Sequence, residues 1–257
     1  MPNPLARIYL CLIAVVILVP LAGCNAAAPP PNRVVVFGAI HSGHRTSDRY
    51  STGVLRDAIR AIKPDLILCE IPPSRVAVAL AQYDATEQIT EPRVRVFPEY
   101  VDVIIPLRGE LGFEIIGCAA WTQEMANDRR EKLTRWQSER PGETREVNAA
   151  QRATSQAITN AGWDDDPLGI HTPQYDEFIR QGMEPYNRLF NDDLGPGGWD
   201  NINAGHYAYI EQALDANTGE GLTVLIIFGS GHKYWFLDQL QQRDDIELMD
   251  PRQFFIP

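Results

Sequence analysis

Short apolar runs alternate with amphipathic stretches in the first part of the chain. Residues 34–37 are apolar and β-branched, which is typical of a buried strand, and the run ends at Gly38. A helical stripe follows between residues 54 and 62, with Ser51 or Thr52 as the predicted N-cap and Pro64 as the stop. A second apolar strand is predicted over 65–70. Together these segments predict a strand–helix–strand unit.

The alternation continues to the C-terminus. After a turn predicted at Pro72-Pro73, we expect helices over 98–111, 174–190, 203–215 and 233–242, and strands over 113–118, 222–228 and 246–249. This order predicts an α/β fold, with a mainly parallel central sheet and helices on both of its faces. The stretch from 122 to 160 is polar and helix-prone, with an interruption at Pro141-Gly142. The region of about 120–215 is therefore predicted to be a helical insertion or cap.

The first residues follow a different pattern, that of an export signal. Arg7 is followed by a nearly continuous apolar run from 8 to 21 and then by Leu21-Ala22-Gly23-Cys24. This resembles the lipobox of bacterial lipoproteins, which predicts a signal peptide over 1–23 and a lipid such as palmitate on Cys24. A transmembrane anchor is disfavoured, because the run is shorter than the ~20 residues that a spanning helix needs.

A Pro- and Ala-rich segment, 24–32, is predicted to be a tether between the lipid and a single α/β domain over 33–257. We therefore expect a membrane-anchored lipoprotein that faces the periplasm or the cell exterior. Whether the inner or the outer membrane holds it stays open.

Charge narrows the choice of partners. The chain has 23 Lys and Arg against 34 Asp and Glu, and loss of the signal removes only Arg7, so that 22 against 34 leaves a net charge of −12. Nucleic acid is a poor partner for such a chain, because phosphate contacts need clustered cations.

Two cysteines remain once Cys11 and Cys24 are set aside. Cys69 and Cys118 each end an apolar run. Two buried thiols on neighbouring strands are the simplest interpretation. A disulfide between them is permitted outside the cytoplasm and stays open, but their spacing is not that of a zinc site.

Three of the predicted strands end in polar side chains. His41 follows Gly38 by three residues, Glu70 closes the second strand, and His232 follows Gly229-Ser230-Gly231. Ligands of open α/β sheets bind at the carboxyl ends of the strands, so these three side chains are expected to converge. Two imidazoles and a carboxylate form a ligand set for a divalent metal. Gly38, Gly229 and Gly231 would let the backbone turn sharply and approach a ligand.

The two Gly-x-x-His motifs and the glutamate after the second strand resemble the TraB/PrgY/GumN/Tiki superfamily, which is related to the ChaN-like and erythromycin-esterase-like proteins. The resemblance covers roughly residues 33–70 and 222–250. Tiki members are metal-dependent proteases, and the resemblance makes His41, Glu70 and His232 metal ligands or acid/base groups. The chain departs from the family where an Arg-Asn pair is expected before the late motif, since it reads Trp199-Asp200-Asn201-Ile202-Asn203.

The leading hypothesis is a lipid-anchored hydrolase that acts on peptide or ester bonds. In a metal-dependent form, Mn, Co or Zn would activate a water and Glu70 would serve as ligand or base. In a metal-free form, His41 would deprotonate water and Glu70 would orient it. His44, three residues after His41, and His206 are candidate accessory residues.

A non-catalytic lipoprotein that binds a ligand is the alternative hypothesis. The same resemblance implies haem binding, as in ChaN-like relatives, or peptide binding, as in PrgY-type members. Tyr207 and His171 are then candidate axial ligands of haem. A degenerate member with only a structural role is a third interpretation, which the missing arginine keeps open.

Overall fold

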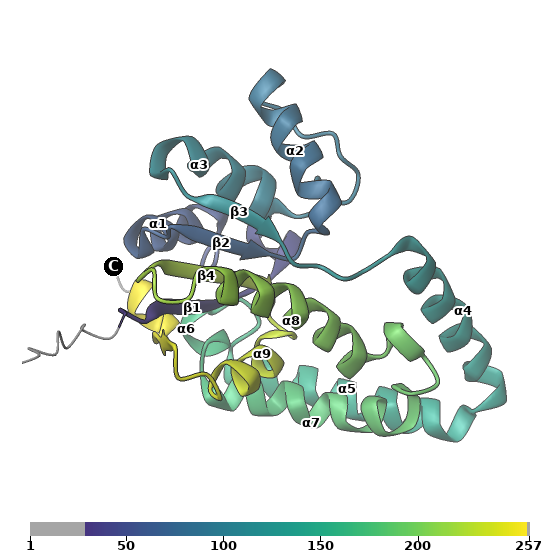
Figure 1. The fold of residues 1–257 in the computed structure, drawn as a ribbon. Helices are drawn as coiled ribbons and strands as arrows, with labels where there is room; N and C mark the ends of the chain where they lie inside the picture. Colours follow the sequence, from purple (N-terminus) through teal and green to yellow (C-terminus); the bar gives the residue numbers. More distant parts are fainter. Residues whose placement is uncertain (1–28, 256–257) are drawn as a thin grey trace, which may run out of the picture.

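A parallel β-sheet forms the centre of the computed structural model, which describes residues 29–255 (Figure 1). The strand order is β3-β2-β4-β1-β5, and every neighbouring pair is parallel. The strands are β1 (Asn32–Ala39), β2 (Leu66–Cys69), β3 (Glu114–Gly117), β4 (Thr223–Gly229) and β5 (Ile246–Leu248). The α/β prediction is therefore confirmed, with β4 between β1 and β2 although it comes late in the sequence.

Helices lie on both faces of this sheet. They are α1 (Thr52–Ile62), α2 (Pro73–Thr86), α3 (Ile105–Leu111), α4 (Gln123–Glu139), α5 (Pro141–Ala161), α6 (Pro167–Ile170), α7 (Pro173–Phe190), α8 (Trp199–Ala216) and α9 (Lys233–Leu240). Short helical turns are η1 (His41–Arg45), η2 (Glu99–Ile104), η3 (Gly195–Gly197) and η4 (Pro251–Phe254). Among the residues described, no helix is both long and apolar enough to cross a bilayer.

The central strands are apolar on both sides because each side meets a helical layer. Leu225 and Ile227 of β4 belong to the core that α1, η2 and α3 cover. Val224 and Ile226, which point the other way, pack in the core formed with α8 and α9. This explains why β4 reads as a continuous apolar run rather than as an alternating one.

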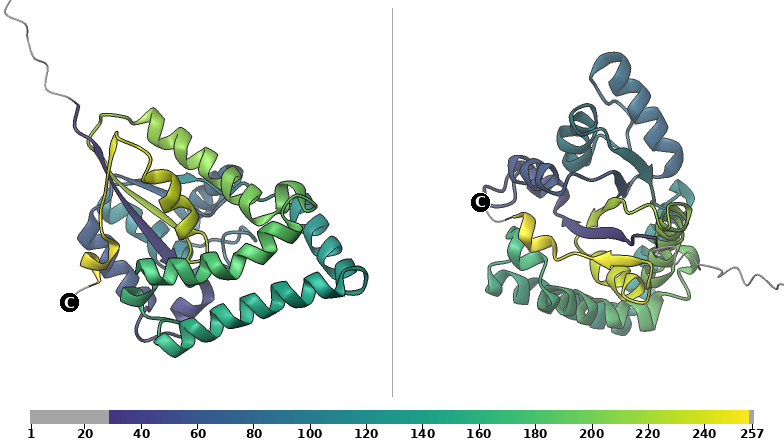
Figure 2. Two further views of the ribbon diagram at one scale, coloured as in Figure 1. Left: turned by 90° about the horizontal axis from the view of Figure 1, so that it is seen from below. Right: turned by 60° about the vertical axis from the view of Figure 1, so that its left-hand side comes forward.

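The predicted cap is confirmed as the helices α4 to α8. Helices α5 and α7 run side by side along one side of the sheet (Figures 1 and 2). They approach closely at Gly182, where an added Cβ would lie 2.3 Å from the Thr154 hydroxyl oxygen. The cap has a small core of its own, formed by Trp136, Val147, Tyr186, Phe190 and Leu194.

Three boundaries differ from the sequence-based predictions. Helix α2 follows Pro72, where only a turn was predicted, because Pro73 occupies the first helical turn, where its missing N–H costs nothing. The predicted helix over 98–111 starts with the π-helical turn η2. The ordered domain also starts before Arg33, since the buried Asn32 side chain bonds to the backbone of Asn217 and Leu222.

The cysteines that the structure describes, Cys69 and Cys118, are both free and buried. Burial raises the pKa of Cys69 well above its usual value and that of Cys118 to about 12. Both thiols are therefore protonated packing groups, in agreement with the simplest interpretation of the sequence. The predicted signal segment, Cys24 and most of the predicted tether lie outside the described residues.

His171 connects the cap to β1. Its Nε2 accepts a hydrogen bond from the Gly38 N–H (2.9 Å), its Nδ1 donates to the Pro167 carbonyl (2.6 Å), and its ring stacks on Phe255. Burial lowers the pKa of His171 to about 3. Both ring nitrogens are thus hydrogen-bonded to backbone groups inside the protein, and neither is free for a ligand. The position of His171 therefore does not support its prediction as an axial haem ligand.

Replacing His171 with Gln is expected to reduce the acid sensitivity of folding. The folded pKa lies below the unfolded value, so His171 contributes stability that is lost as the pH falls below about 6.5. Urea unfolding gives the free energy of unfolding at about pH 6.5 and at about pH 4.5. The decrease in this free energy between the two pH values should be smaller by roughly 2 kcal/mol in His171→Gln than in the wild type. Equal losses in the two proteins would contradict this assignment.

Candidate functional site

Glu70, His232 and His41 follow three adjacent strands, β2, β4 and β1, at the same edge of the sheet. His41 Nε2 lies 3.8 Å from Glu70 Oε2, and His232 Nε2 lies 3.8 Å from Glu70 Oε1. The parallel register explains this, because Cys69 is opposite Ile227 and Ala39 is opposite Gly229. The predicted convergence of the three side chains is confirmed.

Two hydrogen bonds, one from its backbone and one to its carboxylate, hold Glu70 between the two histidines. Its N–H donates to the Tyr100 hydroxyl (2.9 Å), which in turn donates to the carbonyl of Ile227 (3.0 Å). Its carboxylate accepts a hydrogen bond from the N–H of Gly229 (2.7 Å). Burial raises the pKa of Glu70, and the charge of His41 and the bond from Gly229 oppose this rise. The carboxyl group therefore has a fixed position between the two histidines.

His41 is oriented by Glu99. Its Nδ1 donates to Glu99 Oε1 (2.6 Å), and its ring contacts Phe97. The residue has a φ of 48°, in the left-handed region, which costs free energy and is concentrated at functional sites. Burial alone would lower the pKa of His41, but the hydrogen bond to Glu99 and the charges of Glu70 and Glu99 together raise it above its usual value.

His232 is oriented by Asn203 of α8. Its Nδ1 donates to Asn203 Oδ1 (2.6 Å), while Asn203 Nδ2 donates to the Trp199 carbonyl (2.8 Å). The indole of Trp199 stacks on the imidazole, with ring centroids 4.6 Å apart. Burial, with a contribution from the neighbouring His206, lowers the pKa of His232 well below its usual value. The pKa values of the two imidazoles are therefore shifted in opposite directions.

Glu99 and Asn203 were not predicted as site residues. Glu99 is the first residue of η2 and is fully buried, whereas Asp102 of the same turn is partly exposed and pairs with Arg45. The sequence alone does not distinguish these two acids. Asn203 lies in the segment Trp199–Asn203, which contains no arginine, and its side chain contacts His232.

The hydrogen bonds on the two Nδ1 atoms determine which atoms of His41 and His232 face Glu70. Because both Nδ1 atoms donate to oxygens, each neutral imidazole turns the lone pair of Nε2 toward the Glu70 carboxylate. Three electron-pair donors thus face one another, an arrangement suited to a shared cation. Outer carboxylate or amide partners on Nδ1 also accompany metal-bound histidines.

The geometry of these donors is wider than that of a closed metal site. Within residues 29–255, no three His, Cys, Asp or Glu side chains form a group that could hold a metal as they stand. The nitrogen–oxygen separations of 3.8 Å exceed the roughly 3.4 Å that tetrahedral zinc bonds of about 2.1 Å would give. The donor types suit a divalent cation, but the described side chains stand farther apart than bonds to zinc would hold them.

Two of the three motif glycines are sterically required. A Cβ on Gly229 would lie 2.6 Å from His41 Nε2, and one on Gly38 would lie 2.9 Å from the Ser230 backbone. A Cβ on Gly231 would meet the edge of Trp199 at an ordinary 3.5 Å. Close approach is therefore the reason for glycine at Gly38 and Gly229, and not at Gly231.

The site opens into a cavity of about 370 Å³. Its lining comprises Ala39, Ile40, His41, Trp199, Gly229, Ser230, Gly231 and His232. The cap shapes this lining, because the Tyr175 hydroxyl of α7 bonds to the Ser230 hydroxyl (2.9 Å) and the buried Lys233 ammonium donates to Asp176 (2.5 Å). The loop that carries His232 is thus fixed on the cap side.

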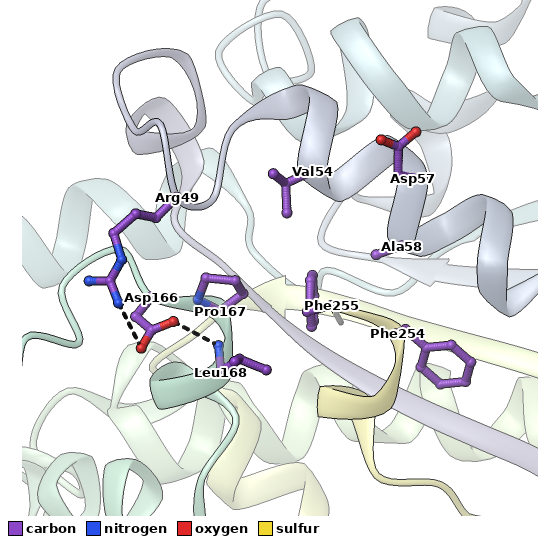
Figure 3. Close-up of a pocket in the computed structure, with 9 residues that line it drawn as sticks. All are labelled: Arg49, Val54, Asp57, Ala58, Asp166, Pro167, Leu168, Phe254 and Phe255. Atoms are coloured by element: carbon purple, nitrogen blue, oxygen red, sulfur yellow. Dashed lines mark hydrogen bonds and ion pairs between the residues drawn. The ribbon is translucent and has the colours of Figure 1, made fainter. Parts of the chain in front are cut away.

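A larger cavity, of about 440 Å³, lies elsewhere (Figure 3). Val54, Ala58, Phe254 and Phe255 contribute apolar surface to it, and its polar rim includes the ion pair of Arg49 with Asp166. None of the three converging residues lines it. We therefore place the candidate site at the smaller cavity, because His41 and His232 line it.

The two predicted accessory histidines have different positions. His44 is buried, with Nε2 accepting from the Ile40 N–H and Nδ1 donating to the Tyr50 carbonyl, so it holds its loop and is not an accessory group of the site. His206 lies beside the site, with its ring 5.3 Å from that of His232, and burial lowers its pKa to about 4. The haem candidate Tyr207 packs in the core beside Trp235.

Replacing Glu99 with Gln is expected to lower the pKa of His41. The amide oxygen still accepts the bond from Nδ1 but no longer carries the charge that favours imidazolium. The pKa can be read from an NMR titration of the His41 ring. Asp102→Asn is the matched control, since Asp102 lies on the same turn and pairs with Arg45. An unchanged His41 pKa in Glu99→Gln would refute the assignment.

Comparisons of the chain with protein-family models, with curated proteins and with solved structures found no match. Membership of the superfamily that the two histidine motifs resemble stays a prediction, and the function of the site has to be inferred from its geometry.

Proposed function

We propose that the protein is a hydrolase of ester or peptide bonds, with His41, Glu70 and His232 as its reacting groups. The observation that carries this proposal is the pair of imidazoles, each fixed through Nδ1, whose Nε2 atoms lie on either side of one buried carboxylate at the edge of a cavity. Such positioned titratable groups are typical of hydrolytic acid/base chemistry.

His41 is suited to moving protons. Its side chain is 36% exposed, which gives substrate access, and the buried Glu99 stabilises its charged form. Because the pKa of His41 is raised above its usual value, the group can take a proton from water as a base and return it to a leaving group as an acid. His232, which is buried and neutral, offers a lone pair that remains available throughout.

A divalent cation is the second element of the proposal. His41 Nε2, His232 Nε2 and the Glu70 carboxylate would hold it, while Glu99 and Asn203 keep the two rings oriented. When bound, Mn, Co or Zn would lower the pKa of water and polarise a carbonyl group. In the metal-free form, His41 and Glu99 act as a general base and its orienting carboxylate.

Hydrolysis should depend on all three residues. The purified protein would be assayed against 4-nitrophenyl esters and a tetrapeptide library. His41→Ala, Glu70→Gln and His232→Ala are each expected to reduce kcat/KM by about 100-fold or more, because each removes a reacting group. Glu110→Gln is the control, since that carboxylate is exposed and pairs with Arg60.

Exhaustive chelation in the same assay separates the two chemistries. Activity that is lost and then restored by Mn, Co or Zn assigns the reaction to the metal form, and unchanged activity assigns it to the metal-free form. Hydrolysis that persists in all three variants, or no hydrolysis by the wild type, would refute the proposed function.

We also propose that the protein works at a membrane, through a lipid on Cys24, facing the periplasm or the cell exterior. The Leu-Ala-Gly-Cys sequence at 21–24 supports this. Such a location excludes cytosolic substrates and favours peptides or lipid-borne esters.

Replacing Cys24 with Ser is expected to abolish labelling by a palmitate analogue and to release the protein from the membrane fraction, because the thiol is the acyl acceptor. Cys69→Ser, which changes a buried thiol, should keep the label. A Cys24→Ser protein that is still labelled would rule out lipidation at this position.

A further inference from the structure

The cap carries an arginine, Arg129 of α4, that forms no ion pair with an acid within residues 29–255. Lys132 and Arg135 of the same helix each form an ion pair with a carboxylate four residues away. In the part of the chain that the structure describes, the guanidinium of Arg129 instead bonds to the Tyr186 hydroxyl (3.0 Å). It also lies 5.8 Å from the ring centroids of both Trp121 and Tyr186.

A series of ring contacts connects this guanidinium to the candidate site. The Trp121 ring is 6.4 Å from that of His206, and the His206 ring is 5.3 Å from that of His232. An added Cβ on Gly197, two residues before Trp199, would lie 3.5 Å from the Arg129 Cβ. The positive charge of Arg129 also contributes, as a minor cause, to the lowered pKa of His232. Arg129 therefore lies on the cap side of His232.

Half-burial of an unpaired cation has a free-energy cost. Aromatic faces recover part of that cost, but a guanidinium is stabilised most by two charge-assisted hydrogen bonds to an oxyanion. Tyr186 takes the Nε–H of Arg129, and no other described residue bonds to the remaining four donors of the fork, which can therefore serve a ligand. Arg129, which is half-buried on the cap side of His232, is thus suited to bind an anionic part of a substrate that extends from the site toward α4.

The surrounding charges restrict the kind of anion. Two buried carboxylates, Glu70 and Glu99, lie at the same site. One unpaired guanidinium balances one negative charge, and the two carboxylates would repel a dianion more strongly than a monoanion. A carboxylate carries one negative charge, so it matches the single guanidinium and is repelled less by the two carboxylates than a phosphomonoester dianion would be.

We propose that Arg129 binds a carboxylate of the substrate, so that the bond presented to His41, Glu70 and His232 belongs to a peptide or acyl amino acid with a free carboxyl end. Recognition of the carboxylate does not require catalysis, but its meaning as substrate selection rests on the proposed hydrolase function.

Binding of a matched pair of probes tests this proposal. N-acetyl-trialanine and its C-terminal amide differ by one charge, and their affinities for the full-length protein can be measured by calorimetry. The wild type is expected to bind the acid about tenfold more tightly than the amide, as charge-assisted bidentate pairs do. Arg129→Gln should remove this preference, and Arg129→Lys should retain part of it because the charge remains.

Arg130→Gln is the matched control, because Arg130 is the next residue of α4, is exposed, and bonds to Asn127. It should keep the wild-type preference for the acid. Circular dichroism of the two Arg129 variants checks that they fold, and Arg129→Lys keeps the test valid if Arg129→Gln does not.

The outcomes for binding and for hydrolysis are separate. An acid preference that depends on Arg129 supports the carboxylate site, even if the protein hydrolyses neither probe and the proposed hydrolase function fails. Equal affinities of the wild type for the two probes, or a preference that survives in Arg129→Gln, overturns the carboxylate site while leaving hydrolysis to its own test. Tighter binding of phenyl phosphate than of phenylacetate also overturns it.

Discussion

The parallel pairing of β4 with β1 on one side and with β2 on the other is the constraint on which the rest of the structure depends. β4 comes almost two hundred residues after β1, yet its backbone lies between the two strands of the first strand–helix–strand unit. Residues Thr223–Gly229 are buried throughout, so a shift in register would place apolar side chains wrongly on both faces. That register brings Glu70, His232 and His41 to one edge.

At this edge the protein accepts polar groups that its core would otherwise exclude. Tyr100, Glu99 and Asn203 hold the three strand-end residues of the candidate site through hydrogen bonds that satisfy most of the buried atoms. Two buried atoms beside the site, Glu99 Oε2 and His206 Nε2, have no partner in the described structure. Unpaired buried polar atoms cost free energy, so the presence of these two beside the site accords with a place built for a ligand rather than for stability.

The cap completes the site instead of merely covering it. Asn203 and Trp199 of α8 orient His232, and Tyr175 of α7 fixes Ser230 in the loop before it. His171, just after α6, bonds to Gly38 at the other histidine motif. Both motifs thus contact residues inserted between β3 and β4. The orientation of His232 depends on this insertion, whereas that of His41 depends on Glu99 of η2.

The sequence by itself determined the α/β class, the positions of the five strands, the helical cap and the three residues at the strand ends, because apolar runs, caps and strand-end motifs are local patterns. It missed α2, whose apolar face is small, and it did not reveal the partners Glu99 and Asn203. It also ranked His44 as an accessory group, whereas the fold turns both of its ring nitrogens to backbone groups. Tertiary structure alone decided these matters. The partners of His41 and His232, Glu99 and Asn203, are distant in sequence, and the partners of His44, although near in sequence, meet its ring only through the fold of its loop.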